Sequence, residues 1–60
     1  MIIAKDLKLG DHVIFNDEHL NRNEEVLVRF IDKDYCGLSH IGEKSCFISY
    51  YKDNKIKKIL

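Results

Sequence analysis

Apolar and polar residues alternate over several short stretches of this 60-residue chain. The clearest stretch is 25–31, where Val26, Val28 and Phe30 occupy every second position. Such alternation, in a segment rich in β-branched and aromatic residues, predicts a β-strand with one buried face. Three polar residues, 32–34, follow it and predict a turn.

A returning strand is expected over 35–41, because its apolar residues also fall on alternate positions. If residues 32–34 form the loop of a hairpin, each apolar side chain of one strand meets an apolar or aromatic partner on the other. The expected pairs are Phe30 with Cys36, Val28 with Leu38, and Val26 with His40.

The segment before this hairpin begins with a sharp corner. Gly10 tolerates a positive φ angle and Asp11 can accept hydrogen bonds from backbone N–H groups, so the two residues predict a turn that leads into a strand through Val13 and Phe15. Residues 16–25 are almost entirely polar and predict a long loop.

The rest of the chain predicts further short strands. We expect strands over 1–4, 45–51 and 56–60, with turns at 42–44 and 52–55. The final strand is expected beside residues 1–3, where it would shield both edges of the sheet. These elements indicate an all-β, antiparallel fold of five to six strands in a single domain spanning residues 1–60.

One sequence motif near the N-terminus is similar to that of a known family of small β-proteins. The spacing of Leu7, Gly10, Asp11, Val13 and Phe15, followed by a polar loop, a twisted hairpin and a strand pair, resembles the SH3-like small β-barrels, including their KOW and Tudor-like branches. The resemblance implies a small SH3-like barrel and carries no ligand with it.

Composition narrows the class of protein. Apolar residues at 45% and charged residues at 33% are ordinary globular proportions, and no apolar run is long enough to cross a bilayer. The N-terminus lacks a secretory pattern, so we expect a cytoplasmic protein whose two cysteines are thiols. A composition rich in Lys, Ile and Asn, without Pro or Trp, resembles that of proteins from small reading frames of AT-rich bacteria, their phages and plasmids, and favours an inhibitor or adaptor of a host protein.

Charge is unevenly distributed although the net charge is zero. Residues 1–34 hold five basic and eight acidic side chains, and residues 35–60 hold five lysines and two acids. Our first hypothesis is a non-enzymatic adaptor or inhibitor that binds a protein partner through the acidic loop and a nearby rim. Leu20 is the only apolar side chain of the loop and either packs beneath it, which we favour, or anchors the partner. The residues expected to bind are Asp17, Glu18, Leu20, Glu24 and Tyr35.

The C-terminal segment supports a second hypothesis, nucleic-acid binding. Lysines neutralise phosphates, and an exposed tyrosine stacks on a base. Because adjacent residues of a strand point to opposite faces of the sheet, only one of Tyr50 and Tyr51 can face the hydrophobic core, and the other is exposed. The residues expected to bind are Tyr51, Lys52, Lys55, Lys57 and Lys58. A third hypothesis is a homo-oligomer in which an exposed edge strand pairs with its copy.

Metal binding and catalysis have weaker support in the sequence. Cys36, His40 and Cys46 are possible zinc ligands, but neither half of the set forms a tight knuckle such as Cys-x2-Cys. Burial of both cysteines as small apolar side chains is the simpler interpretation. A core this small also leaves no room for an enclosed active site, so we expect no enzyme activity, no metal and no cofactor.

Overall fold

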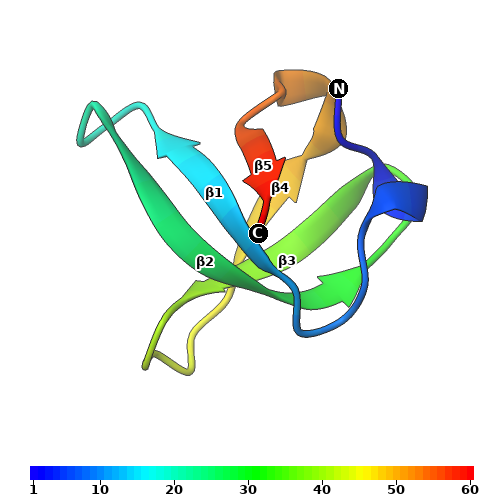
Figure 1. Cartoon of the computed structure of the whole chain (residues 1–60), viewed down its shortest axis with the longest axis horizontal. Coiled ribbons are helices and arrows are strands. Elements are labelled where there is room, and N and C mark those ends of the chain that lie inside the picture. Colours follow the sequence, from blue (N-terminus) through cyan, green and yellow to red (C-terminus); the bar gives the residue numbers. More distant parts are fainter.

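A computed structural model describes all residues from 1 to 60 and contains one five-stranded antiparallel sheet (Figure 1). The strands follow the order β4-β3-β2-β1-β5 across the sheet. The elements are β1 (His12–Asp17), β2 (Arg22–Ile31), β3 (Tyr35–His40), β4 (Phe47–Tyr50) and β5 (Ile56–Ile59), with two 3-10 turns, η1 (Ala4–Asp6) and η2 (Tyr51–Asp53). The all-β antiparallel prediction is confirmed. No pairing joins the edge strands β4 and β5, so the sheet is not closed.

The predicted corner before β1 is present. Gly10 has a φ angle of +86°, and the Asp11 carboxylate accepts a hydrogen bond from the Lys8 N–H at 2.8 Å. The corner is also tied to β2, because the Gly10 N–H donates to the Val28 carbonyl and the Val28 N–H donates to the Asp11 carbonyl, both at 2.9 Å. These bonds fix the direction in which β1 enters the sheet.

The predicted long loop over 16–25 is wrong, because most of it belongs to a β-hairpin. The pairing of β1 with β2 continues through Asn16 opposite Asn23 to Asp17 opposite Arg22, which leaves only residues 18–21 as the turn. The side chains of Asn16 and Asn23 share a hydrogen bond of 3.0 Å. Backbone pairing extends the strands here although their side chains are polar, because this end of the hairpin projects away from the core.

The expected register of β2 and β3 is correct for two pairs and wrong for the third. Val26 lies opposite His40 and Val28 opposite Leu38, but a bulge follows Val28 and places Phe30 opposite Gly37. An extra residue in one strand turns every later side chain to the other face of the sheet. Phe30 therefore lies on the outer face, 39% exposed, and Cys36 pairs with Ile31 instead.

The two ends of the chain also differ from the prediction. Residues 1–3 form no strand, because the Asp6 carboxylate accepts a hydrogen bond from the Ile3 N–H at 3.0 Å and η1 follows. β5 pairs with β1 instead, with Val13 opposite Ile59 and Phe15 opposite Ile56. The predicted strand over 45–51 is shortened to β4, and η2 begins at Tyr51.

One hydrophobic cluster lies inside the curved sheet. Its buried members are Leu7, Val13, Phe15, Val26, Val28, Cys36, Leu38, Tyr51 and Ile56. Every strand except β4 contributes to it, and partly buried Phe47 of β4 packs against it. No helix has the length and apolar character required to span a membrane.

Candidate functional site

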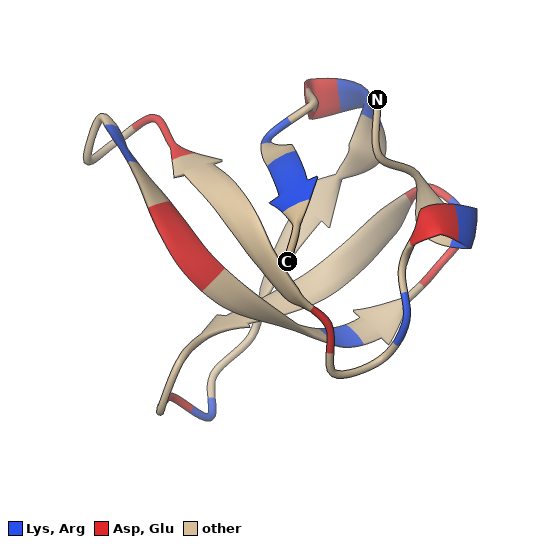
Figure 2. Ribbon diagram, viewed as in Figure 1, with Lys and Arg blue, Asp and Glu red and all other residues tan.

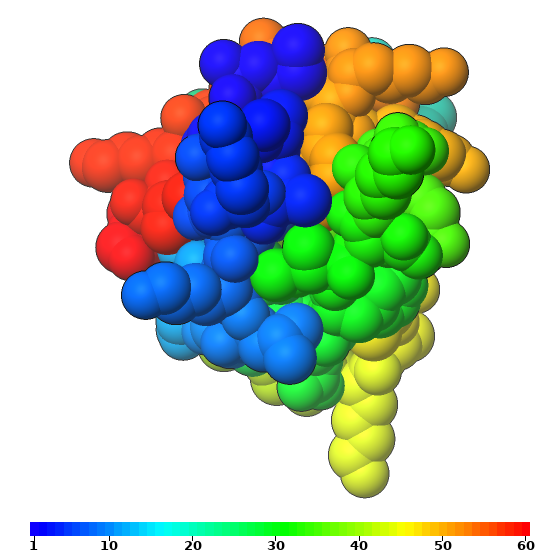
Figure 3. All heavy atoms as spheres, turned by 90° about the vertical axis from the view of Figure 1, so that its right-hand side faces the viewer, coloured from blue at the N-terminus to red at the C-terminus, as the bar shows by residue number.

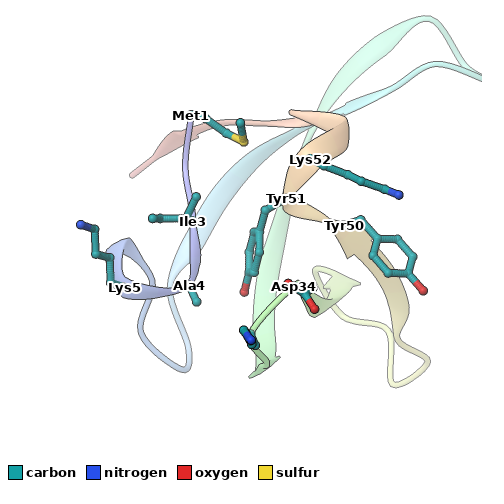
Figure 4. A pocket seen from close by; sticks show the side chains of 9 residues that line it. Met1, Ile3, Ala4, Lys5, Asp34, Tyr50, Tyr51 and Lys52 are labelled. Carbon is teal, nitrogen blue, oxygen red and sulfur yellow. The ribbon is translucent and has the colours of Figure 1, made fainter.

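The largest hollow of the surface is an open groove of about 650 Å³ between the N-terminal segment and η2. We call it the lysine-rimmed groove. Its lining residues are Met1, Ile3, Ala4, Lys5, Lys33, Asp34, Tyr50, Tyr51 and Lys52. Figure 3 shows this face of the molecule, with the N-terminal segment in dark blue, the β2–β3 turn in green and the region of η2 in orange. In Figure 4, Met1, Ile3 and Ala4 line one side, and Tyr50 and Lys52 lie on the other, beyond the Tyr51 ring.

Tyr51 forms the fixed floor of the groove. Its hydroxyl donates to the Asp32 carbonyl at 3.1 Å, and its N–H donates to the Asp34 carbonyl at 3.1 Å. Burial, with a smaller effect of neighbouring Cys36, raises the pKa of Tyr51 to about 12, so the hydroxyl remains protonated. Since Tyr51 is only 6% exposed, its predicted role as a ring that stacks on bases is wrong. Tyr50, the last residue of β4, is the exposed tyrosine.

Three lysines give the groove its charge. Lys5, Lys33 and Lys52 line it together with a single acid, Asp34. None of the three lysines forms an ion pair within the chain. The Lys52 ammonium lies 5.8 Å from the centre of the Tyr50 ring, a cation–π distance. The groove therefore combines an apolar floor with a positive rim.

Aromatic rings continue from the groove onto the outer face of the sheet. Tyr50 lies opposite Tyr35 with ring centres 5.6 Å apart, and Tyr35 lies 6.3 Å from Phe30. The rings are tilted by 59° and 88° in these two pairs, so they offer no common plane on which successive bases could stack. The neighbouring Asp32 carboxylate raises the pKa of Tyr35.

The residues predicted to bind a protein partner do not form one surface. Asp17, Glu18 and Leu20 lie at the turn of the β1–β2 hairpin, whereas Tyr35 begins β3 and lies beside the groove. Figure 2 shows mainly acidic residues, in red, along this hairpin, basic residues, in blue, on β5, and both kinds on η2. Leu20 is 54% exposed, so the packed arrangement that we favoured for it is wrong.

Glu24 is occupied by contacts within the sheet. Its carboxylate accepts a hydrogen bond from the Arg22 Nε at 2.9 Å and contacts the His40 Nε2. Arg22, and to a lesser degree His40, lower the pKa of Glu24 below 4.5. The His40 Nδ1 also lies 3.4 Å from a Glu43 carboxylate oxygen. Glu24 is therefore a poor candidate for binding a partner.

The lysines predicted to bind nucleic acid are also dispersed. Lys52 lines the groove, but Lys55 lines a separate cleft of about 240 Å³ beside the hairpin turn. The Lys57 ammonium donates to the Asn54 carbonyl at 2.6 Å. Lys58 lies on β5, opposite Ile14. A continuous phosphate-binding track is not present.

The cysteines and histidines do not gather around a common point. Cys36 is buried, and burial raises the pKa of its thiol, whereas Cys46 is exposed in the loop before β4. The prediction that both cysteines are buried is therefore wrong for Cys46. No three His, Cys, Asp or Glu side chains are grouped as a metal site would require.

Of the nine residues that line the groove, only Tyr51 and Lys52 are among the residues that the sequence predicted to bind a ligand. Met1, Ile3 and Lys5 were assigned to a strand or its end, and Lys33 to a simple turn. Asp6, three residues after Ile3, was the available signal, because this spacing allows a carboxylate to accept the N–H at the start of a helical turn. Comparisons of the chain with protein families, curated proteins and solved structures find no match.

Proposed function

We propose that this chain is a non-enzymatic binding module that captures an extended, acidic and partly apolar segment of another protein. The observation that carries this proposal is the lysine-rimmed groove, which is lined by apolar residues and by three lysines that form no ion pair within the chain. An adaptor or inhibitor acts in this way when the bound segment belongs to the protein that it controls.

The apolar and basic residues that line the groove suit a ligand that carries both apolar side chains and carboxylates. Ile3 and Tyr50, which are 36% and 46% exposed, offer apolar surface that a leucine or similar side chain would cover. Lys5, Lys33 and Lys52 stand at the rim, where carboxylates of the same segment would neutralise them. An extended segment directs alternate side chains to opposite sides, which suits a groove with a floor and a charged rim.

The strand order supports placing the chain among SH3-like barrels, as the motif around Gly10 implies. β1 lies between β2 and β5, and a 3-10 turn precedes the final strand. Under this proposal the fold is a small, partly open barrel, and its binding surface is built from the segments that connect its strands.

A peptide titration tests the proposed function. The probe is a fluorescent peptide of about ten residues that alternates leucine and aspartate, with a leucine–lysine peptide as its counterpart. We expect the acidic peptide alone to bind, and the double variant K33E/K52E to weaken binding by roughly tenfold or more. Lys44→Glu with Lys57→Glu makes the same charge change outside the groove and should have a much smaller effect.

Two results would contradict the proposal. One is an equal loss of peptide affinity in the groove variant and the control variant, which would show that the loss comes from the change in net charge and not from the groove. The other is strong, salt-sensitive binding of a single-stranded oligonucleotide in place of the peptide, which would favour the nucleic-acid hypothesis.

A further inference from the structure

The turn of the β1–β2 hairpin presents an exposed apolar side chain that follows two acidic residues in the sequence. We call residues 17–21 the hairpin tip. Leu20 is 54% exposed, and neither Asp17 nor Glu18 forms an ion pair within the chain. This combination of negative charge and apolar surface is complementary to the lysines and apolar residues that line the lysine-rimmed groove.

The tip is held in a defined shape. The Asp17 carboxylate accepts hydrogen bonds from the His19 N–H at 3.0 Å and the Leu20 N–H at 3.2 Å. The Asn21 N–H donates to the Glu18 carbonyl at 3.3 Å, and Asn21 adopts a φ angle of +50°. Because the turn is ordered before binding, little conformational entropy is lost when it docks.

Within one chain the tip and the groove face different directions. In Figure 1 the tip projects at the upper left, while the N terminus, η1 and the β2–β3 turn, whose residues line the groove, lie at the right. The cleft beside the tip shares no lining residue with the groove. Contact between them therefore requires two molecules.

We infer that the hairpin tip of one copy of this chain docks in the lysine-rimmed groove of a second copy. Leu20 covers the apolar floor near Ile3 and Tyr51, and the carboxylates of Asp17 and Glu18 face the lysines of the rim. The two partners use different surfaces, so the contact is head-to-tail and each pair retains one unused tip and one unused groove.

This inference rests on the proposed function, since the second copy occupies the site assigned to the acidic segment. Only a few residues of the tip enter the groove, so the contact is much smaller than a standard stable interface. A dissociation constant on the order of 0.1–1 mM is expected for such a contact. Self-association would then be weak and would compete with a partner for the groove.

Sedimentation velocity across a concentration series, from about 20 µM to about 1 mM, tests the inference. We expect the wild-type sedimentation coefficient to rise with concentration. The tip variant E18K/L20S and the groove variant K33E/K52E should each remain monomeric. An equimolar mixture of the two variants should form dimers that do not grow further, because the single intact tip and the single intact groove are both used within the dimer.

Three outcomes would overturn the inference. They are a monomeric wild type over the whole range, variants that associate like the wild type, and a mixture that remains monomeric. Pairing of edge strands would produce the second outcome, because both variants keep β4 and β5 intact. Melting curves of the variants establish that the exposed substitutions leave the fold intact.

The two proposals fail separately. The peptide titration uses the protein at a concentration of about 10 µM, at which the self-contact is almost absent. Peptide binding without self-association would remove only the head-to-tail contact. Self-association that the K33E/K52E variant abolishes, without binding of the acidic peptide, would retain the contact and remove the proposed capture of a partner segment.

Discussion

The ring of Phe30 lies directly over Gly37 of the neighbouring strand. A Cβ atom added to Gly37 would lie 2.1 Å from the Phe30 Cε1, much closer than two carbon atoms can approach. The ring, and not the backbone conformation, therefore favours glycine at this position, since the φ angle of Gly37 is not among the positive values of the chain. The bulge after Val28 creates the contact by turning Phe30 to the outer face.

We predict that Gly37→Ala destabilises the protein by about 1–2 kcal/mol, because the Phe30 ring must swing away from the sheet. The ring is partly exposed, so it can move without disturbing the core. In a Phe30→Ala background the same substitution should cost almost nothing, since alanine suits a strand better than glycine does. Urea denaturation of the four proteins measures this coupling. Equal costs in both backgrounds would show that the ring does not impose the glycine.

The hydroxyl groups of the two adjacent tyrosines should differ in their effect on stability. Tyr51→Phe removes the hydrogen bond to the Asp32 carbonyl and should lower the free energy of unfolding by about 1 kcal/mol. Tyr50→Phe changes an exposed side chain and should have an effect below about 0.5 kcal/mol. Thermal unfolding compares the two variants. A larger loss in Tyr50→Phe would contradict the assignment of Tyr51 to the floor.

Acid should remove a contribution of Glu24 to stability. Because Arg22 and His40 hold the pKa of this carboxyl below its ordinary value of 4.5, the folded state favours the charged form. The resulting stabilisation is present above pH 4.5 and is lost as the pH falls through the lower pKa of the folded state. We therefore expect wild type and Glu24→Gln to differ in melting temperature near neutral pH and to converge in acid.

Melting curves between about pH 7 and about pH 3 measure this convergence. Glu18→Gln is the matched control, because its carboxylate forms no ion pair within the chain. A constant difference between wild type and Glu24→Gln at every pH would assign the effect of Glu24 to packing and not to its charge.

Local patterns predicted the strands that line the core. Val26 and Val28 are buried as the alternation indicates, and their partners across the hairpin are the expected ones. The corner at Gly10 was predictable for the same reason, since a positive φ angle and a short carboxylate are local requirements. The all-β fold class follows from these elements.

Long-range features were beyond the reach of such patterns. The alternation of apolar and polar residues does not reveal the bulge that turns Phe30 outward, because the bulge depends on the register in which β3 pairs with β2. The alternation of apolar residues also did not reveal that β5 pairs with β1 and not with residues 1–3. Residues 1–3 and β1 are both short and apolar, so either could have been the partner of β5. The groove was not predicted because it depends on where residues 1–6 pack after β5 has taken the free edge of β1.

The pairing of β5 with β1 also has a consequence for the order in which the strands are expected to form. The three hairpins from β1 to β4 connect neighbouring segments, and such hairpins form within microseconds. β5 must instead close a loop of roughly 40 residues before Ile56 and Ile59 reach β1, and this closure is entropically unfavourable. We therefore expect residues 56–59 to be incorporated last, so that β1 is until then an open edge at which two unfinished chains can join.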